Sequence, residues 1–411
     1  MARRAVIIGA SLAGLRTAEA LIRQGYEGDI TIFGAERHMP YNRPPLSKKY
    51  LSGQLQPSEL SFAVGEELDR VSWILDTPVV GVDIASNMVR VSDGSQIQFD
   101  DLVIATGVRP RRNPEWGDET QNSFVLRTKD DADLLKAALQ SRGHLIIQGG
   151  GFMGTEVAAM ALTMGCQVTL ISRSKHILSR QLGELVGQEA QRRHQERGLT
   201  VITETDIVRP EFGTSTQAGR FQGVVLTNGQ EVEGDIFLQA TGSVPNTEWL
   251  EGSGIDINDG VLTGKNLRAV DWDGNSVPNV FAGGDVARFP NPIFDATPRR
   301  VEQWNIPSEC AKYVARQICS GASDDVALAD GSSFSAIPSF WSDQFEFSFF
   351  GLGIPSLATR AVLMHGELDS EFVVGYFRDR QLVGVCGNGL RASVQSYRSQ
   401  IGKPLGMASN A

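Results

Sequence analysis

One supersecondary pattern occurs twice in the chain, about 140 residues apart: a short apolar strand, a glycine-rich turn, a helical segment and a second apolar strand. The first copy has a strand at residues 5–8, the turn GASLAG at 9–14 and a strand at 30–33. The second has a strand at residues 145–147, the turn GGGFMG at 149–154, a helix expected over about 155–164 and a strand at 168–171. Each copy is a βαβ unit, so the repeat predicts an α/β fold with two parallel sheets.

The two turns have the spacing of dinucleotide-binding turns. In such a turn the first glycine allows the sharp bend, the middle one lets the backbone approach a pyrophosphate, and the last lets the helix pack on the strand. The second turn is complete, whereas the first has Ser11 at the middle position. A turn that only ends a parallel strand is the simpler interpretation, but it explains one copy more easily than two. Because helix N-termini suit pyrophosphate, two turns predict two dinucleotides, FAD and NAD(P)H.

Three later segments fit the same scheme. Two strands end in Ala-Thr-Gly, at Thr106-Gly107 and at Thr241-Gly242. A third strand, at residues 280–282, delivers Asp285 beside two glycines, where its carboxylate would accept a hydrogen bond from a ribityl hydroxyl. A turn aspartate is the simpler interpretation.

The order GASLAG, ATG, GGGFMG, ATG and FAGGD resembles the two-dinucleotide flavoproteins of the glutathione reductase fold. Within that fold, PYNRPPLSK at residues 40–48 and RRVEQW at 299–304 resemble the ferredoxin reductases of the putidaredoxin reductase type, which serve ring-hydroxylating dioxygenases and bacterial cytochromes P450. The resemblance covers residues 1 to about 400. It implies two Rossmann-like dinucleotide-binding domains plus an α+β C-terminal domain.

The resemblance also implies domain boundaries. The FAD-binding domain would comprise residues 1–112 and 244–327, the NAD(P)H-binding domain residues 113–243, and the C-terminal domain residues 328–411. The alternation of Phe345, Phe347 and Phe349 predicts a strand in the last of these, and a helix is expected over 391–399.

Site residues follow from the resemblance, position by position. For FAD they are Gly9, Ser11, Ala13, Gly14, Glu36, Arg43, Lys48, Val79, Thr106, Gly107, Arg127, Asp285 and Trp304. For NAD(P)H they are Gly149, Gly151, Phe152, Met153, Gly154, Glu156, Arg173 and Gly242. Glu36 is assigned to the FAD ribose, although the strict family position for that acid falls on Ala35.

Three of these residues are the expected catalytic residues. Lys48 would lie beside the isoalloxazine, Trp304 against the ring system, and Glu156 would pair with Lys48 and orient the carboxamide. Without the motifs, Lys48 would be a solvated lysine and Trp304 a core residue. Glu156 would be a first-turn glutamate favoured by the helix dipole.

The chain lacks the sulfur that other branches of this fold use. Disulfide reductases of the fold carry two cysteines, and peroxide reductases one, in the segment that here spans residues 33–51 and contains none. The four cysteines are scattered, which argues against a disulfide framework, a metal site and an iron–sulfur cluster in this chain. Without a thiol relay, the flavin itself must release single electrons. This favours a [2Fe-2S] ferredoxin that feeds an oxygenase as the acceptor.

Charge and hydropathy narrow the partners and the location. A net charge of −10 with no long Lys/Arg run argues against nucleic acid, and no stretch approaches the roughly 20 apolar residues of a membrane span. We therefore expect a cytoplasmic protein, as monomer or homodimer. Five arginines are candidates for a surface that attracts an acidic ferredoxin: Arg109, Arg111, Arg112, Arg299 and Arg300. A solvated loop is the alternative.

The choice between NADH and NADPH stays open. Sites that prefer NADH end the second strand of the unit with an acid, whereas here the strand runs into Ser172-Arg173. An arginine with nearby hydroxyls accommodates a 2′-phosphate, so the residues predict competent use of NADPH. The resemblance instead favours NADH.

Other functions on the same scaffold are also open. A rubredoxin reductase, an unspecific diaphorase or a monodehydroascorbate reductase would differ only in the acceptor. A signalling flavoprotein resembling apoptosis-inducing factor is a rival from another class, in which slow NADH oxidation shifts conformation.

Overall fold

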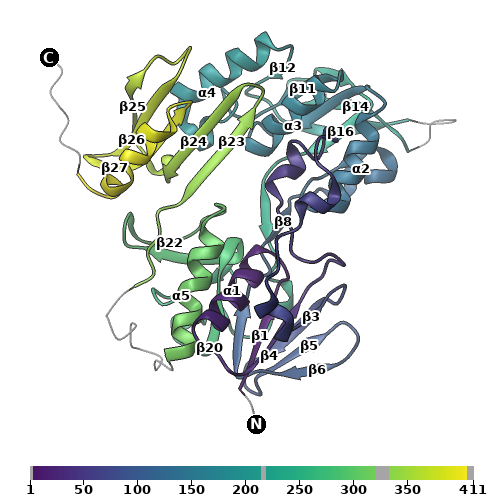
Figure 1. The fold of residues 1–411 in the computed structure, drawn as a ribbon. Helices are drawn as coiled ribbons and strands as arrows, with labels where there is room; N and C mark the ends of the chain where they lie inside the picture. Colours follow the sequence, from purple (N-terminus) through teal and green to yellow (C-terminus); the bar gives the residue numbers. More distant parts are fainter. Residues whose placement is uncertain (1–2, 214–218, 321–332, 405–411) are drawn as a thin grey trace. The chain divides into compact units, whose positions relative to one another are not determined.

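The computed structural model describes residues 3–213, 219–320 and 333–404. The chain divides into two compact units (Figure 1). The first comprises Met1–Asn42, Ser61–Arg109 and Val244–Pro338, and the second comprises Arg43–Leu60, Pro110–Ser243 and Ser339–Ala411. The chain passes from one unit to the other in β8 (Val108–Pro110) and back in β17 (Ser243–Pro245).

The first unit is built on a six-stranded sheet in the order β19-β20-β7-β1-β2-β3. The strands are β1 (Arg4–Ile8), β2 (Asp29–Phe33), β3 (Val71–Ile74), β7 (Asp101–Ile104), β19 (Arg268–Val270) and β20 (Ser276–Ala282). All pairs are parallel except β19 with β20. Helices α1 (Leu12–Arg23) and α5 (Ile306–Ser320) contact each other beside the sheet (Figure 1). The centre of β1 is fully buried, as a parallel strand covered on both faces requires.

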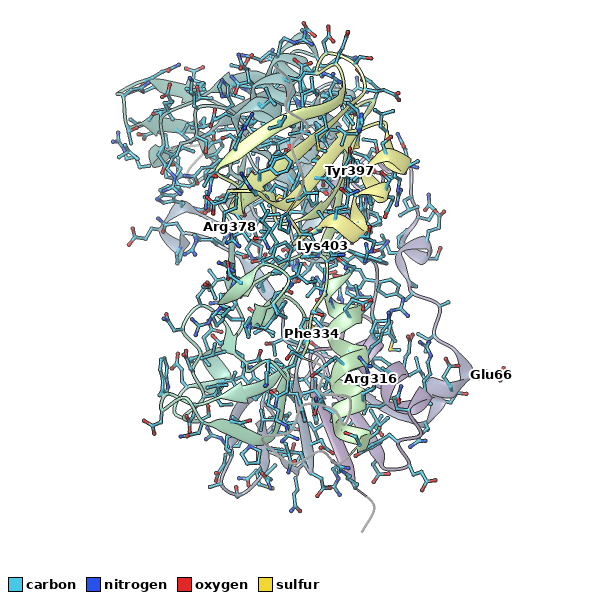
Figure 2. The ribbon with its side chains drawn as sticks, turned by 90° about the vertical axis from the view of Figure 1, so that its left-hand side faces the viewer. Glu66, Arg316, Phe334, Arg378, Tyr397 and Lys403 are labelled. Atoms are coloured by element: carbon cyan, nitrogen blue, oxygen red, sulfur yellow. The ribbon has the colours of Figure 1, made fainter. Side chains whose placement is uncertain are left out.

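Smaller elements complete this unit. One three-stranded sheet consists of β4 (Val79–Asp83), β5 (Met88–Val91) and β6 (Gln96–Gln98). Another consists of β18 (Val261–Leu262), β21 (Ala287–Asn291) and β22 (Asp295–Arg300). The unit also contains the short 3-10 helices η3 (Glu66–Arg70), η7 (Glu248–Leu250) and η8 (Gly284–Val286). Phe334, labelled in Figure 2, packs edge-on against Phe289 of β21 and Tyr313 of α5, with ring centroids 5.1 and 5.6 Å away. This contact holds the last stretch of the unit against its core.

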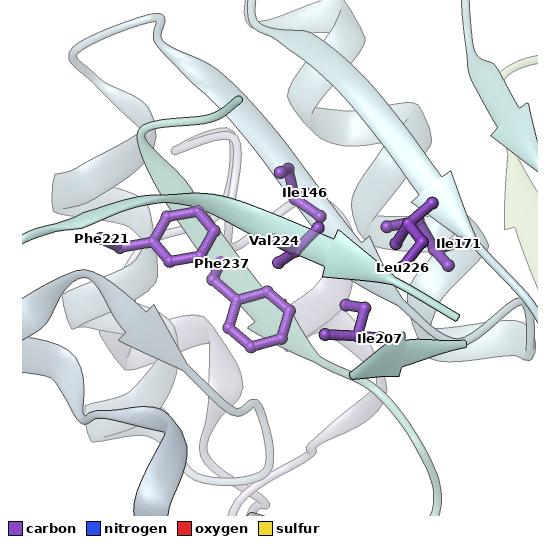
Figure 3. Close-up of a cluster of buried hydrophobic side chains, with 7 residues drawn as sticks. All are labelled: Ile146, Ile171, Ile207, Phe221, Val224, Leu226 and Phe237. Carbon is purple, nitrogen blue, oxygen red and sulfur yellow. The ribbon is translucent and has the colours of Figure 1, made fainter. Parts of the chain in front are cut away.

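The second unit repeats the parallel sheet, in the order β12-β11-β10-β16-β9. Its strands are β9 (Ser123–Phe124), β10 (His144–Gln148), β11 (Gln167–Ile171), β12 (Thr200–Ile202) and β16 (Ile236–Gln239), and its helices are α2 (Lys129–Leu139), α3 (Phe152–Thr163) and α4 (Ser179–Glu196). An antiparallel sheet of β13 (Ile207–Phe212), β14 (Phe221–Leu226) and β15 (Glu231–Glu233) packs on it through a buried cluster (Figure 3). In that cluster the rings of Phe221 and Phe237 stack with centroids 5.2 Å apart.

The C-terminal part of this unit is an antiparallel sheet in the order β23-β24-β27-β26-β25. Its elements are β23 (Ser339–Gln344), β24 (Phe347–Gly353), β25 (Arg360–Gly366), β26 (Phe372–Arg378), β27 (Gln381–Asn388), α6 (Arg391–Ser396) and the turns η9 (Pro355–Leu357) and η10 (Arg398–Gln400). The second unit also contains four short 3-10 helices. Two of them, η1 (Pro44–Ser47) and η2 (Pro57–Leu60), come before its sheets in the chain, and the other two, η4 (Pro114–Trp116) and η5 (Glu119–Gln121), follow β8.

Two local expectations for this region are wrong. Phe345 does not continue a strand with Phe347 and Phe349, because it lies in the hairpin turn with φ 54°. The last helix ends at Ser396 instead of residue 399, and η10 follows it. The domain boundaries expected from the sequence stay predictions, and the boundary at residues 327–328 lies outside the described residues.

Candidate active site

The first glycine-rich turn requires glycine at two positions for steric reasons. Gly9 has φ +123°, and a Cβ there would lie 2.1 Å from the carbonyl oxygen of Ala105. A Cβ on Gly14 would lie 2.0 Å from the carbonyl oxygen of Gly9. Both distances are far below van der Waals contact, so only glycine lets the turn close on β7 and start α1.

The elements singled out in the first unit meet around this turn. A Cβ on Gly284 would lie 3.0 Å from the Cβ of Ala13, which places the residue next to Asp285 against the start of α1. The N–H of Gly283 donates to the carbonyl of Ile104, at the end of β7. The Thr106 hydroxyl donates to the carbonyl of Asn246 at 2.8 Å. The structure thus brings together the turn, the first Ala-Thr-Gly ending and the Gly-Gly-Asp segment.

Other residues assigned to FAD are spread over the first unit. The Glu36 carboxylate, just beyond β2, accepts a hydrogen bond from the Tyr41 hydroxyl at 2.6 Å. Val79 is buried at the start of β4, and Trp304, just before α5, keeps 41% of its surface exposed. Trp304 is therefore not an ordinary core residue, and its contact with a flavin stays a prediction.

The second turn repeats the geometry of the first. Gly149 has φ +116°, and a Cβ there would lie 2.2 Å from the carbonyl oxygen of Ala240. A Cβ on Gly154 would lie 2.1 Å from the carbonyl oxygen of Gly149. At the middle position, Gly151, the nearest atom would be the side-chain nitrogen of Gln181 at 3.1 Å, the far end of a flexible side chain. A flexible side chain, not backbone, therefore faces the middle of the turn, and a pyrophosphate at the helix N-terminus would have to displace only that side chain.

The helix after this turn begins earlier than the sequence suggested. It starts at Phe152, directly after Gly151, instead of near residue 155. Glu156 is consequently its fifth residue, and the first turn contains no acidic residue. The interpretation of Glu156 as a first-turn glutamate held by the helix dipole is therefore wrong.

Glu156 instead forms a buried ion pair with Lys48. The Nζ of Lys48 lies 2.8 Å from Oε1 of Glu156, and the two side chains are 16% and 7% exposed. Lys48 follows η1, which contacts α3, so the PPLS turn positions the lysine. The Ser47 hydroxyl donates to Oε2 of Glu156 at 2.5 Å, and the Ser342 hydroxyl donates to Oε1 at 2.5 Å.

Two arginines assigned to FAD meet in the second unit. The guanidinium of Arg43 donates to the carbonyl of Arg127 at 2.9 Å. Arg43, Lys48 and Arg127 belong to the second unit, together with the residues assigned to NAD(P)H.

The end of β11 carries a cation where an NADH site carries an acid. Ser172 is buried, and its hydroxyl accepts the N–H of Ser174 at 3.2 Å. The side chain of Arg173 is 70% exposed, and its Nε lies 3.6 Å from Oδ2 of Asp206. The other oxygen of Asp206 accepts from the Gln148 amide at 2.8 Å. The Arg173 guanidinium is thus only loosely held.

None of the cysteines is suited to relay electrons. All four lie in described parts of the chain and are unpaired. Burial raises the pKa of each thiol, and raises that of Cys310 to about 12. Since the thiolate is the reactive form, these thiols stay protonated and unreactive near neutral pH.

The five arginines expected to form a basic surface mostly have carboxylate partners. Arg109 pairs with Glu248, Arg112 with Glu119, Arg299 with Asp295, and Arg300 with Asp259 and Glu302. The Arg111 guanidinium donates to the carbonyl of Ser243 at 3.4 Å. These acids offset much of the positive charge that would steer an acidic partner, so the predicted surface is weaker than the sequence suggested.

Three residues around Glu156 were not found from the sequence: Ser47, Ser342 and Gln344. Ser47 lies in the PYNRPPLSK block, which gave a signal. Ser342 and Gln344 are far from Glu156 in the sequence, and their pattern gave none.

The described residues contain neither a candidate membrane span nor a candidate metal-ligand cluster. Over residues 3–213, 219–320 and 333–404, no helix has both the length and the apolar character for crossing a bilayer. In the same part of the chain, no three His, Cys, Asp or Glu side chains gather as metal ligands would.

Comparison with known proteins supports the same reading of the turns. The family model described as pyridine nucleotide-disulphide oxidoreductase matches residues 3–308. The ferredoxin–NAD(+) reductase component of an anthranilate 1,2-dioxygenase system from Burkholderia cepacia is 31% identical, over 96% of this chain and 93% of the relative. A ferredoxin–NAD(P)(+) reductase from Sphingomonas sp is 30% identical, over 97% and 93%.

A solved structure has the same fold. The crystal structure of the covalent putidaredoxin reductase–putidaredoxin complex superposes with a TM-score of 0.87 at 28% identity, covering 97% of this chain and 92% of that one. Two dinucleotide turns and these relatives establish FAD and NAD(P)H as the cofactors. The chain is an oxidoreductase that belongs to the pyridine nucleotide-disulphide oxidoreductase family.

Proposed function

We propose that this chain is the reductase component of an oxygenase system, which takes hydride from NAD(P)H and passes single electrons to a [2Fe-2S] ferredoxin. The observation that carries this proposal is that two dinucleotide turns occur in a chain whose four thiols are at least partly buried and have raised pKa values. Bound FAD supplies the chemistry, because it accepts two electrons at once and releases them singly. The names of the relatives, reductase components of dioxygenase systems among them, support the ferredoxin as acceptor.

The residues of the second unit would hold the nicotinamide cofactor. The turn at residues 149–154 and the N-terminus of α3 offer backbone N–H groups to its pyrophosphate. We assign Phe152, Met153, Glu156 and Gly242 to the same site, as the resemblance implies.

Lys48 would place a fixed positive charge at the flavin. Its ammonium donates to Glu156 and, at 3.4 Å, to the carbonyl of Pro44. These two contacts restrict the lysine while leaving it a donor for the cofactor. Positive charge there would stabilise the electron-rich reduced ring.

The residues that we assign to FAD in the first unit would let the backbone come close to the cofactor. The turn at residues 9–14, with Ala13 at the start of α1, fits the pyrophosphate, and Asp285 in η8 fits the ribityl chain. Glu36, Val79, Thr106 and Trp304 complete our assignment in this unit, and Arg43 and Arg127 in the other.

We also propose that NADPH is used competently beside NADH. The exposed Arg173 stands where NADH sites carry an acid, and Ser172 and Ser174 supply hydroxyls nearby. One relative is named for NAD(P)(+), whereas another is named for NAD(+). A specificity ratio above about 100 in favour of NADH would refute this proposal.

The proposed location is the cytoplasm. Four unpaired cysteines are typical of proteins in a reducing compartment. The partner would be a small acidic ferredoxin, and we propose neither a nucleic-acid nor a membrane partner.

An anaerobic titration tests the function. NADH or NADPH should bleach the flavin absorbance of the purified protein, and an oxidised [2Fe-2S] ferredoxin should then restore it. Recovery with a dye but with no ferredoxin would indicate a diaphorase, and recovery with rubredoxin alone would indicate a rubredoxin reductase. Protein that is colourless and takes up no FAD would end the proposal.

A further inference from the structure

The Glu156 carboxylate is held by three donors that come from outside its own helix. Oε1 accepts from the Lys48 ammonium and the Ser342 hydroxyl, and Oε2 accepts from the Ser47 hydroxyl. Ser47 and Lys48 lie at η1, whereas Ser342 comes from β23 and follows Glu156 by 186 residues in the chain. The C-terminal sheet therefore contributes directly to the surroundings of the ion pair.

One face of β23 packs on α3 (Figure 1). Side chains alternate along a strand, and Phe340, Ser342 and Gln344 are the buried positions of β23. The ring of Phe340 lies 5.6 Å from that of Phe152, the first residue of α3. This apolar contact fixes the position of β23 along α3, so that Ser342 lies next to Glu156.

Gln344 sets the direction of the Ser342 hydroxyl. Its Nε2 donates to the Ser342 Oγ at 2.9 Å, and the two side chains are 1% and 0% exposed. A hydroxyl has a single hydrogen. Because Ser342 accepts from Gln344, that hydrogen is left for the carboxylate of Glu156. Without Gln344, the hydroxyl would be free to rotate away.

We propose that Ser342 and Gln344 are positioning residues for the Lys48–Glu156 pair. Ser342 holds one carboxylate oxygen, Gln344 aims Ser342, and the ammonium of Lys48 thereby keeps one place. The proposal rests on the function proposed above, in which this pair serves the transfer from NAD(P)H. It extends the site to the C-terminal sheet, where the sequence indicated no functional residue.

The test is the rate of flavin reduction by NAD(P)H, measured by stopped flow on the FAD-loaded protein. S342A removes one hydrogen bond to a charged group, and we expect an about 10-fold lower rate at saturating nucleotide with less than about twofold change in KM. Q344M should lower the rate in the same direction by about 3-fold, because the hydroxyl remains but loses its orientation. S342T keeps the hydroxyl and should recover most of the rate.

Ser348 provides a matched control on the same hairpin. Its hydroxyl donates to the Asp343 carboxylate at 2.8 Å, but at an exposed position. S348A should leave the rate unchanged. A double-mutant cycle adds a readout that general loosening would not produce: in an E156Q background, S342A should have little further effect.

Three results would overturn the proposal. The first is an S342A rate within twofold of the wild type, and the second is an equal loss of rate in S342A and S348A. Additive effects of S342A and E156Q would also contradict it, because they would show that Ser342 acts independently of Glu156. Flavin reduction is measured without ferredoxin, so its dependence on Ser342 stands even if ferredoxin proves not to be the acceptor.

Discussion

Replacing Arg173 with alanine should lower kcat/KM for NADPH about 10-fold and leave that for NADH nearly unchanged. The side chain is 70% exposed, so a 2′-phosphate would meet it in a largely aqueous setting. Two unit charges 4 Å apart interact by about 1 kcal/mol in water and about 4 kcal/mol near a protein surface. Arg173 must also give up Asp206, at 3.6 Å, for the phosphate. We therefore take the lower part of that range, about 1.4 kcal/mol, which is tenfold.

The assay is the steady-state reduction of a dye at varied NADPH and NADH, at low and high ionic strength. Salt should reduce the NADPH effect, because the contact is exposed. R209A is the matched control, since Arg209 is a similarly exposed arginine of the same unit, paired with Glu211 at 2.8 Å. A ratio of the two kcat/KM values that changes by less than twofold in R173A would refute the reasoning.

Four further substitutions test other parts of the structure. G9A and G149A each place a Cβ 2.1–2.2 Å from a carbonyl oxygen. G9A should therefore give protein that loses FAD, which the flavin absorbance of the purified protein would show. G149A should give yellow protein with a raised KM for NAD(P)H, which steady-state kinetics would show. E156A leaves the largely buried ammonium of Lys48 without its carboxylate partner. The free energy of unfolding, measured by urea denaturation, should therefore fall by about 3 kcal/mol. Burial lowers the pKa of His194, so as the pH falls below about 6.5 the unfolded chain takes up that proton before the folded chain does. In that pH range the free energy of unfolding should fall by up to about 1.4 kcal/mol for each unit by which the pH is lowered, and H194F should reduce that slope.

The sequence predicted the parts of the site that are encoded locally. Each glycine turn is fixed by contacts with the strand before it and with the Ala-Thr-Gly strand, and both kinds of element have short, recognisable patterns. The geometry of Gly9 with Ala105 and of Gly149 with Ala240 therefore agrees with an expectation based on spacing alone. The pairing of Lys48 with Glu156 needed the family resemblance as well, because 108 residues separate them.

Other features depend on contacts that no local pattern records. Ser342 reaches Glu156 only because β23 packs on α3, and a serine between Trp341 and Asp343 carries no such information. The acids that pair with the candidate basic arginines are also distant, as Glu248 is from Arg109. The hairpin turn at Phe345 interrupts an alternation that looked like one strand.

The burial of polar groups around Glu156 argues that they are there for function. A buried ion pair contributes little net stability, since the loss of hydration offsets much of the attraction, and apolar side chains of equal volume often stabilise as well. Here a carboxylate and two hydroxyls are buried beside a largely buried ammonium, and the amide of Gln344 contacts one of the hydroxyls. Folding alone gives no reason to keep so many polar groups from water. A requirement to hold one ammonium at a fixed place does give a reason, and the role that we propose for Lys48 at the flavin makes that requirement.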